Sequence, residues 1–177
     1  MNFLEHPYPS SMQDIIEKSE QNINLLVEKL NYKNCSSLND LYKVDSEGDV
    51  VRNKIEFDKM NLTLNSMLNT NSKSNNELKG LYLFGEVGED NKVVPVYIGI
   101  SRTIFRRLRQ HGWGKVSNHA SLAKLMSEDK NDLLPSKEII KKYKVAIVTE
   151  NFDYDLYFME VYIAGKLKTK WNNFRTH

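Results

Sequence analysis

The chain has 177 residues, of which 40% are hydrophobic and 27% are charged, and its formal net charge is +2. This length and composition exclude a disulfide-dependent miniprotein and a collagenous or wholly disordered chain, and they predict a packed core. The charge is uneven, because residues 1–78 carry 8 Lys and Arg against 12 Asp and Glu, whereas residues 79–177 carry 17 against 11. The second part is the candidate for binding a polyanion.

The start of the chain does not resemble a secretory signal. Glu5 and two prolines stand where such a signal is continuously apolar, and no run of about 18 apolar residues occurs anywhere. We therefore expect a cytoplasmic protein without a membrane partner. Cys35 is the single cysteine, which excludes an internal disulfide and a zinc site built from thiolates.

The first predicted element is an amphipathic helix over residues 11–31. Ser10 and Gln13 have the spacing of a capping box, and apolar residues then recur at helical spacing. Shorter helical patterns follow at 38–44 and 50–67. The apolar positions of the first helix are Ile16, Ile23, Leu26, Val27 and Leu30.

A linker is predicted at residues 69–76, which are rich in Asn and Ser and lack periodicity. We place a boundary near residue 75, between a helical N-terminal region (1–75) and a second domain (79–177). The net negative charge of the first region argues against a polyanion clamp. We expect it instead to cover the second domain, to bind a protein partner or to form a homodimer.

After the linker the apolar period changes from 3.6 to 2. Residues 81–84 and 94–100 alternate, with a glycine-containing polar stretch at 88–91 between them, which predicts a β-hairpin. A tight turn in that stretch would pair Tyr82 directly with Tyr97, on the face away from the aliphatic side chains. Two hydroxyl groups would then share one small area.

The second strand of this hairpin contains Pro95, which cannot donate a ladder hydrogen bond, so an edge position or a β-bulge is expected there. A short helix follows, with Ser101 or Thr103 as its cap and Ile104 and Leu108 as its buried pair. The rest of this segment carries Arg102, Arg106, Arg107 and Arg109.

Three more elements complete the chain: a helix near 117–126, a β-branched strand at 144–149 and a helix over about 153–170. The predicted fold is α+β, with a small three-stranded antiparallel sheet flanked by helices and a helical N-terminal extension. Glu160 lies inside the buried stripe of the last helix. That stripe is formed by Leu156, Met159, Ile163 and Leu167.

Glu160 is the most informative residue, because an ionised carboxylate among apolar side chains must either find a cation or become neutral. One interpretation is an internal salt bridge to a lysine or arginine. The other is a metal ligand, since Mg²⁺ binds through one or two carboxylates, retained waters and phosphate oxygens.

The other polar candidates also have two interpretations. Tyr82 and Tyr97 pack well on a sheet face as ordinary strand aromatics, yet each is flanked by glycine, which often marks a close approach to the backbone. The arginine-rich helix fits a solvated surface as well as a phosphate-binding one. His111, four residues after Arg107, fits either a satisfied histidine or a catalytic one.

In their order along the chain, these features resemble the GIY-YIG endonucleases. Gly80-Leu81-Tyr82 is followed after fourteen residues by Tyr97-Ile98-Gly99. Arg107 comes ten residues after the second tyrosine, Glu160 lies on a later apolar helix, and Asn172 stands twelve residues beyond it. The first motif has Leu where the family has Ile, which conserves side-chain volume.

The resemblance covers residues 79–175 and implies a fold similar to the one predicted, with one bound divalent cation, Mg²⁺ or Mn²⁺. It implies a metal-dependent endonuclease that hydrolyses DNA by a one-metal mechanism, with Glu160 as the metal ligand. The catalytic residues it implies are Tyr82, Tyr97, Arg107, His111, Glu160 and Asn172, with Asn173 as the alternative to Asn172.

The resemblance favours Tyr82 as the general base, with Tyr97 as the alternative and His111 as a polarising group. Arg107 would bind phosphate oxygens in the transition state. Asn172 would fix the geometry of the site. Contacts to DNA phosphates are expected from Arg102, Arg106, Arg109 and Lys115, with Lys166, Lys168 and Lys170 as further contributors.

Two other functions are compatible with these motifs. The chain could be a catalytically inactive nucleic-acid-binding or protein-interaction module that keeps the fold. It could also be an unrelated small α/β domain, in which case Tyr82, Arg107 and Glu160 would not share a cleft.

Overall fold

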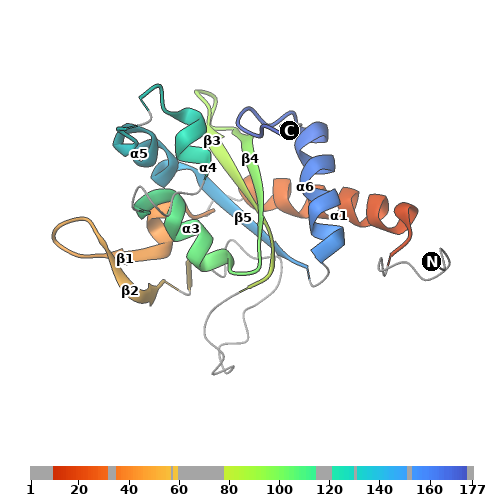
Figure 1. Ribbon diagram of the computed structural model, residues 1–177, viewed down its shortest axis with the longest axis horizontal. Coiled ribbons are helices and arrows are strands. Elements are labelled where there is room, and N and C mark those ends of the chain that lie inside the picture. Colours follow the sequence, from red (N-terminus) through yellow and green to blue (C-terminus); the bar gives the residue numbers. More distant parts are fainter. Residues whose placement is uncertain are drawn as a thin grey trace.

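A computed structural model of the chain describes residues 10–31, 35–56, 58–59, 78–114, 121–129, 131–150 and 153–174. A three-stranded antiparallel sheet forms its centre, with helices on both faces (Figure 1), which confirms the predicted α+β class. The elements are α1 (Met12–Asn31), the 3₁₀ turn η1 (Leu38–Leu41), β1 (Tyr42–Val44), β2 (Val50–Ile55), β3 (Gly80–Val87), β4 (Val93–Ser101), α3 (Ile104–Trp113), α4 (Ser121–Met126), α5 (Leu134–Lys142), β5 (Lys144–Thr149) and α6 (Asp153–Leu167).

Helix α1 confirms the first predicted helix but is capped differently. The side chains of Ser11 and Asp14 accept hydrogen bonds from each other's backbone N–H at 3.1 Å, so the expected box of Ser10 and Gln13 is wrong. The buried face is also rotated from the predicted one. It consists of Ile15, Ser19, Asn22, Leu26 and Leu30.

The helix predicted at 50–67 is wrong for residues 50–55, which form strand β2, and most of the rest lies outside the described residues. Residues 42–44, predicted to continue a helix, are strand β1, paired antiparallel with β2. The turn between them depends on Gly48, whose φ of 83° is a conformation that favours glycine. Asp45 stabilises it by accepting the backbone N–H of Glu47 and Asp49.

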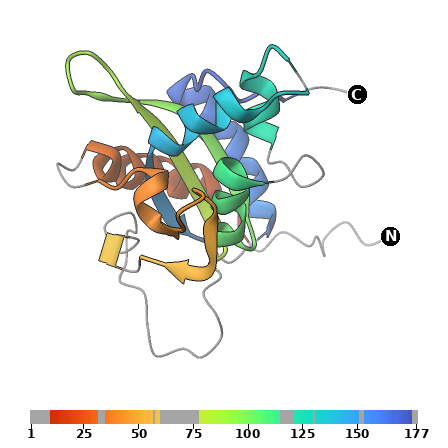
Figure 2. The same cartoon turned by 90° about the vertical axis from the view of Figure 1, so that its left-hand side faces the viewer.

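The hairpin of β3 and β4 is present, but its predicted register is wrong. Tyr82 pairs with Gly99 and Tyr97 pairs with Phe84, two residues away from the expected alignment. A register shift next to Pro95 lies between these pairs and the hairpin turn, which agrees with the irregularity expected at that proline. Strand β4 is an edge strand in the order β4-β3-β5. The hairpin turn extends beyond the helices (Figure 2).

The sheet separates two apolar cores. One face, with Tyr82, Phe84 and Ile147, packs against α3, α4, α5 and the η1–β1 segment. The other, with Leu81, Leu83 and Val148, packs against α1 and α6. Helix α5 was not predicted, α4 begins within the predicted 117–126 helix, and β5 and α6 are close to their predicted bounds. The linker predicted at 69–76 lies outside the described residues.

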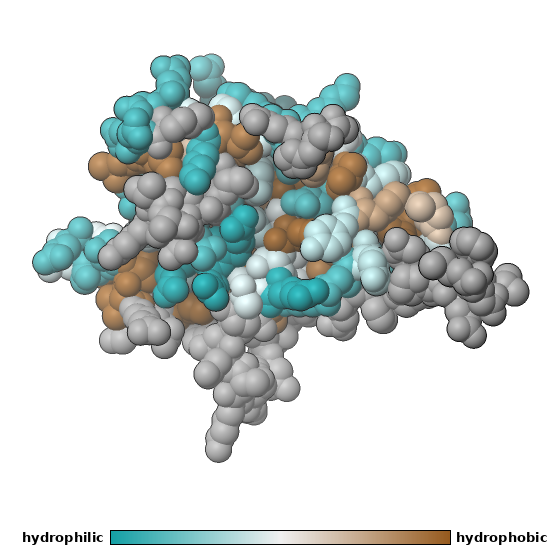
Figure 3. Space-filling view, in the orientation of Figure 1, coloured by the Kyte–Doolittle hydropathy of each residue, from teal (hydrophilic) through white to brown (hydrophobic). Residues whose placement is uncertain are grey.

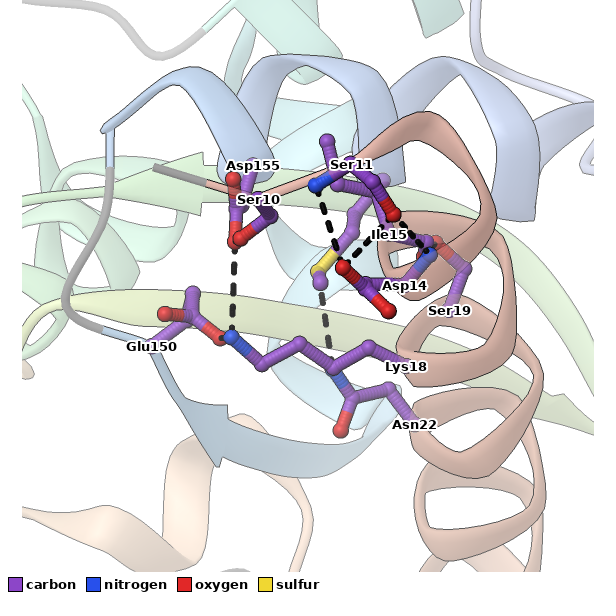
Figure 4. Close-up of polar contacts among 10 residues, drawn as sticks. Ser10, Ser11, Asp14, Ile15, Lys18, Ser19, Asn22, Glu150 and Asp155 are labelled. Carbon is purple, nitrogen blue, oxygen red and sulfur yellow. Dashed lines mark hydrogen bonds and ion pairs between the residues drawn. The ribbon is translucent and has the colours of Figure 1, made fainter. Parts of the chain in front are cut away.

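Helix α1 is joined to the sheet and to α6 by a polar network as well as by apolar contacts (Figure 4). Lys18 lies 2.6 Å from Glu150, which follows β5, and 3.4 Å from Asp155 in the first turn of α6. Ser10 donates a hydrogen bond of 2.9 Å to Asp155. Asp155 is fully buried, so these contacts offset the cost of removing its carboxylate from water.

Cys35 is buried among the apolar side chains around α1. None of the helices in the described residues is long and apolar enough to cross a membrane.

Replacing Lys18 by Met should destabilise the protein, because the buried carboxylates of Glu150 and Asp155 lose their ion pairs with its ammonium group. We expect a loss of about 1–3 kcal/mol in the free energy of unfolding, measured by urea denaturation at pH 7. Gln21→Met, at an exposed position of the same helix, should change it by less than about 0.5 kcal/mol. Equal stability of the Lys18 variant and wild type would show that the network does not hold α1 in place.

Candidate functional site

A cleft of about 510 Å³ lies at the C-terminal end of the edge strand β4. In Figure 3 the surface between α3 and α6 combines strongly hydrophilic side chains with paler, weakly polar ones. Among the described residues no further strand pairs with β4 on its outer side, so groups from both faces of the sheet can meet at its C-terminal end. The cleft is lined by Tyr82, Tyr97, Ile100, Ser101, Arg102, Arg107, Asp153, Leu156, Tyr157 and Glu160.

Tyr82 reaches this edge from the central strand β3 because its neighbour on β4 is glycine. A Cβ atom on Gly99 would lie 2.4 Å from both the Cζ and the hydroxyl oxygen of Tyr82. The tip of the phenol therefore lies directly over the backbone of Gly99. Gly80 has an analogous role at the start of β3, since its Cβ would lie 2.0 Å from the carbonyl oxygen of Val148. The glycines of both sequence motifs are thus required by close packing.

His111 is fully buried on α3 and contacts Tyr82. Its Nε2 lies 2.8 Å from the Tyr82 hydroxyl oxygen, and its Nδ1 has no hydrogen-bond partner among the described residues. Burial lowers the pKa of His111 well below its usual value, and the charge of Arg107 lowers it further, so the ring is neutral. A buried N–H without a partner is rarer than an unpaired acceptor, so we assign the proton to Nε2, which then donates to Tyr82.

Tyr97 joins this cluster diagonally instead of directly opposite Tyr82. The centroid of its ring lies 6.3 Å from that of Tyr82 and 5.6 Å from that of His111. Its side chain is on the same face as that of Tyr82, because a register change of two residues preserves the face. The predicted proximity of the two phenols is therefore confirmed, although the predicted pairing is wrong.

Arg107 is the cation that acts on the whole cluster. It lies one turn before His111 on α3, and its side chain lines the cleft. Its positive charge lowers the pKa of Tyr82, of His111 and of Glu160. In Tyr82 this effect is outweighed, because burial raises the pKa of the phenol well above its usual value, and Tyr97 raises it further.

Glu160 enters the cleft from α6, on the opposite face of the sheet. Burial raises its pKa to about 7, while Arg107 and a hydrogen bond from the backbone of Ile100 act in the opposite direction. It forms no ion pair within the described part of the chain. The internal salt bridge that the sequence left open is therefore not formed with any described lysine or arginine.

Asn172 does not line the cleft. Its Oδ1 accepts a hydrogen bond of 2.9 Å from the Ile98 N–H, and its Nδ2 donates one of 2.8 Å to the Ile98 carbonyl. Thr169 also donates to its Oδ1, and the Trp171 N–H bonds to the carbonyl of Val96. Asn172 therefore attaches the segment after α6 to the outer edge of β4. Asn173 is exposed beside it.

Of the basic residues predicted to contact phosphates, Arg102 lines the cleft. Arg106 is exposed on α3 and Arg109 is half-buried, and neither lines it. Lys115 lies outside the described residues. On α6, Lys166 forms an ion pair of 2.7 Å with Glu20 of α1. Lys168 and Lys170 are exposed beyond the end of that helix.

Two residues that line the cleft, Asp153 and Tyr157, were not predicted from the sequence. Asp153 accepts hydrogen bonds from Arg102, including one of 3.1 Å from its Nε, and lies 2.7 Å from Lys79, so its pKa is lowered to about 2. Tyr157 lines the cleft and is 63% exposed. The available signal was the spacing of Asp153 and Tyr157 from Glu160, which places all three toward one side of α6.

The cleft fits a cation bound through one carboxylate. Glu160 is the lining carboxylate that forms no ion pair with a described residue, since Asp153 is held by Arg102 and Lys79. No group of three or more His, Cys, Asp or Glu side chains in the described ranges could hold a metal. Mg²⁺ and Mn²⁺ remain compatible, because such ions keep several waters and bind substrate phosphate oxygens.

No protein-family model, curated protein or solved structure matches this chain. The functional interpretation therefore depends on the residues and their geometry. Tyr82, Arg107 and Glu160 do share one cleft, which argues against motifs that occur by accident.

Gly99→Ala should destabilise the protein by about 1–3 kcal/mol, because the new methyl group overlaps the rigid, buried ring of Tyr82. Urea denaturation measures the change. Gly165→Ala is the matched control, since a Cβ at that exposed helical position meets nothing within 4 Å and should stabilise α6 by roughly 0.5–1 kcal/mol. Unchanged stability of the Gly99 variant would contradict the close approach described above.

Glu160→Gln should stabilise the protein at pH 8 but not at pH 4.5. The raised pKa means that the folded state binds the Glu160 proton more tightly than the unfolded chain does. The free energy of unfolding of the wild type therefore falls as the pH rises from 4.5 to about 7. Above that range the free energy of unfolding of Glu160→Gln should exceed that of the wild type by roughly 1–3 kcal/mol. Urea denaturation at the two pH values measures this, and an equal effect of the substitution at both would be evidence against a half-buried carboxylate that lacks an ion pair.

Proposed function

We propose that the protein is a metal-dependent endonuclease that hydrolyses phosphodiester bonds of DNA with one divalent cation, as its resemblance to the GIY-YIG endonucleases implies. The supporting observation is that the phenols of Tyr82 and Tyr97, the guanidinium group of Arg107 and the carboxylate of Glu160 line one open cleft, with the buried His111 against the Tyr82 hydroxyl. Hydrolysis forms a bond from a water oxygen to phosphorus and breaks the bond to the 3′ oxygen. Each group of the cleft has a role in that exchange.

Glu160 would hold the cation, Mg²⁺ or Mn²⁺, together with waters and substrate phosphate oxygens. Bound there, the cation supplies Lewis-acid stabilisation of the charge on the phosphoryl and leaving oxygens. A carboxylate binds a cation in its deprotonated form, and the pKa of Glu160 is raised to about 7. Cation affinity should therefore fall as the pH drops below 7.

Arg107 would bind the nonbridging oxygens of the scissile phosphate. Its guanidinium group is permanently charged and planar, and it can donate two parallel hydrogen bonds to a phosphate. It is half-buried at the cleft wall, where hydrogen bonds to developing charge are stronger than in water. A lysine would supply the charge without the forked geometry.

Tyr82 would accept the proton of the attacking water. Its raised pKa keeps it mainly as the phenol near neutral pH, so the reactive form is a minor phenolate population. Arg107 and the Nε2–H of His111 both stabilise negative charge on its oxygen. Tyr97 is the alternative proton acceptor in the same cluster.

Asn172 would act as a positioning residue. By bonding both backbone groups of Ile98 it holds the outer edge of β4, next to Gly99 and thus to the position of Tyr82.

The test is cleavage of supercoiled plasmid and of branched DNA in Mg²⁺ or Mn²⁺, with Glu160→Gln as the diagnostic variant. We expect wild type to cleave and Glu160→Gln to retain less than about 1% of the rate, because the cation loses its carboxylate ligand. Binding of Mn²⁺, followed by electron paramagnetic resonance, should be lost in the same variant and should weaken in wild type between pH 7.5 and 5.5.

Glu89→Gln, in the exposed hairpin turn, is the control for removal of one surface carboxylate and should behave as wild type. Near-normal turnover of the Glu160 variant would refute the metal assignment. DNA binding by wild type without cleavage of any substrate would support the inactive binding module instead.

A further inference from the structure

Tyr157 is an exposed aromatic side chain on the wall of the cleft. It lies three residues before Glu160 on α6, so the two side chains emerge about one helical turn apart on the same side. It is 63% exposed, and it lines the cleft together with Glu160. A tyrosine in this position leaves much of its ring available to a ligand in the cleft.

Other aromatic rings of α6 have structural partners, whereas none of the described rings packs against Tyr157. Phe158 stacks on Tyr162 with centroids 5.7 Å apart. Tyr162 in turn donates its hydroxyl to Glu20 and lies beneath Lys166. These contacts join α6 to α1. Packing contacts therefore explain why α6 carries aromatic side chains at Phe158 and Tyr162, but they do not explain the exposed ring of Tyr157.

The charges beside Tyr157 suit a phosphate backbone. Arg102 and Lys79 both bind Asp153, so two cations face one carboxylate at this end of the cleft. Arg107 adds a further positive charge deeper inside. A positively charged groove that also presents an aromatic ring is the combination by which proteins bind single-stranded nucleic acid.

An aromatic side chain can stack on a base only if that base has left its own stack. In a duplex the faces of each base are covered by its neighbours, whereas an unpaired base can turn toward the protein. The helical-turn spacing of Tyr157 and Glu160 suits contact with one nucleotide, with its phosphate at the carboxylate end of the cleft and its base against the ring.

We propose that Tyr157 stacks on an unpaired nucleobase next to the scissile phosphate, and that the preferred substrate is DNA with single-stranded nucleotides at the cleavage point. This inference rests on the proposed nuclease function for the identity of the ligand. The stacking itself requires binding but not cleavage.

The experiment measures binding in EDTA, where cleavage does not interfere. The probes are a single-stranded oligonucleotide carrying 2-aminopurine and the fully paired duplex of the same sequence, followed by anisotropy and by 2-aminopurine quenching. We expect wild type to prefer the single strand and to quench its fluorescence. Tyr157→Leu should lose roughly tenfold in affinity for the single strand and lose the quenching, with little change for the duplex.

Tyr157→Phe keeps the ring and should retain both properties. Val161→Ala is the control for trimming an exposed apolar residue of α6 that does not line the cleft, and it should match wild type. Equal losses on both probes in Tyr157→Leu, or none on either, would overturn the proposal.

Plasmid cleavage by wild type in Mg²⁺ is assayed separately. It distinguishes failure of the stacking proposal from failure of the proposed nuclease function. Cleavage without a specific effect of Tyr157→Leu refutes only the stacking. Specific stacking without cleavage refutes only the nuclease.

Discussion

The candidate site depends on the contact between the tip of Tyr82 and the backbone of Gly99. Tyr82 belongs to the central strand, and any side chain on the neighbouring edge strand at that position would displace its hydroxyl group. The glycine lets the phenol cross the edge strand on one face of the sheet. Glu160 approaches the same edge from the other face, on α6. Two packed layers thereby contribute to one cleft.

The pKa values of Tyr82, His111 and Glu160, in and beside the cleft, are shifted by burial and by the charge of Arg107. Burial keeps His111 neutral and Arg107 adds to that effect, whereas on Glu160 the charge of Arg107 opposes the effect of burial. Without a closer cation, Glu160 stays difficult to ionise in the folded state. A site that leaves a carboxylate in this condition costs stability, as functional sites commonly do.

Helix α1 is part of the same structure as the sheet. Lys18 connects it to Glu150 after β5 and to Asp155 at the start of α6, the helix that carries Glu160 and Tyr157. At the other end of α6, Lys166 pairs with Glu20 of α1. One face of the sheet thus has a two-helix layer whose position sets where the carboxylate enters the cleft (Figure 1).

The sequence by itself determined the types of most elements and the two faces of the hairpin, because periodicity is a local property. Its motifs also indicated Tyr82, Tyr97, Arg107 and Glu160, which line the cleft, but not Asp153 or Tyr157. Only the tertiary structure decided the register, since the shift beside Pro95 and the packing of Tyr82 on Gly99 are contacts between strands. The strand at 50–55, the backbone role of Asn172 and the lack of an ion pair between Glu160 and any described lysine or arginine were likewise decided by distant segments. The burial of a side chain and the charges around it depend on residues that are close in space, and spacing along the chain does not specify which residues those are.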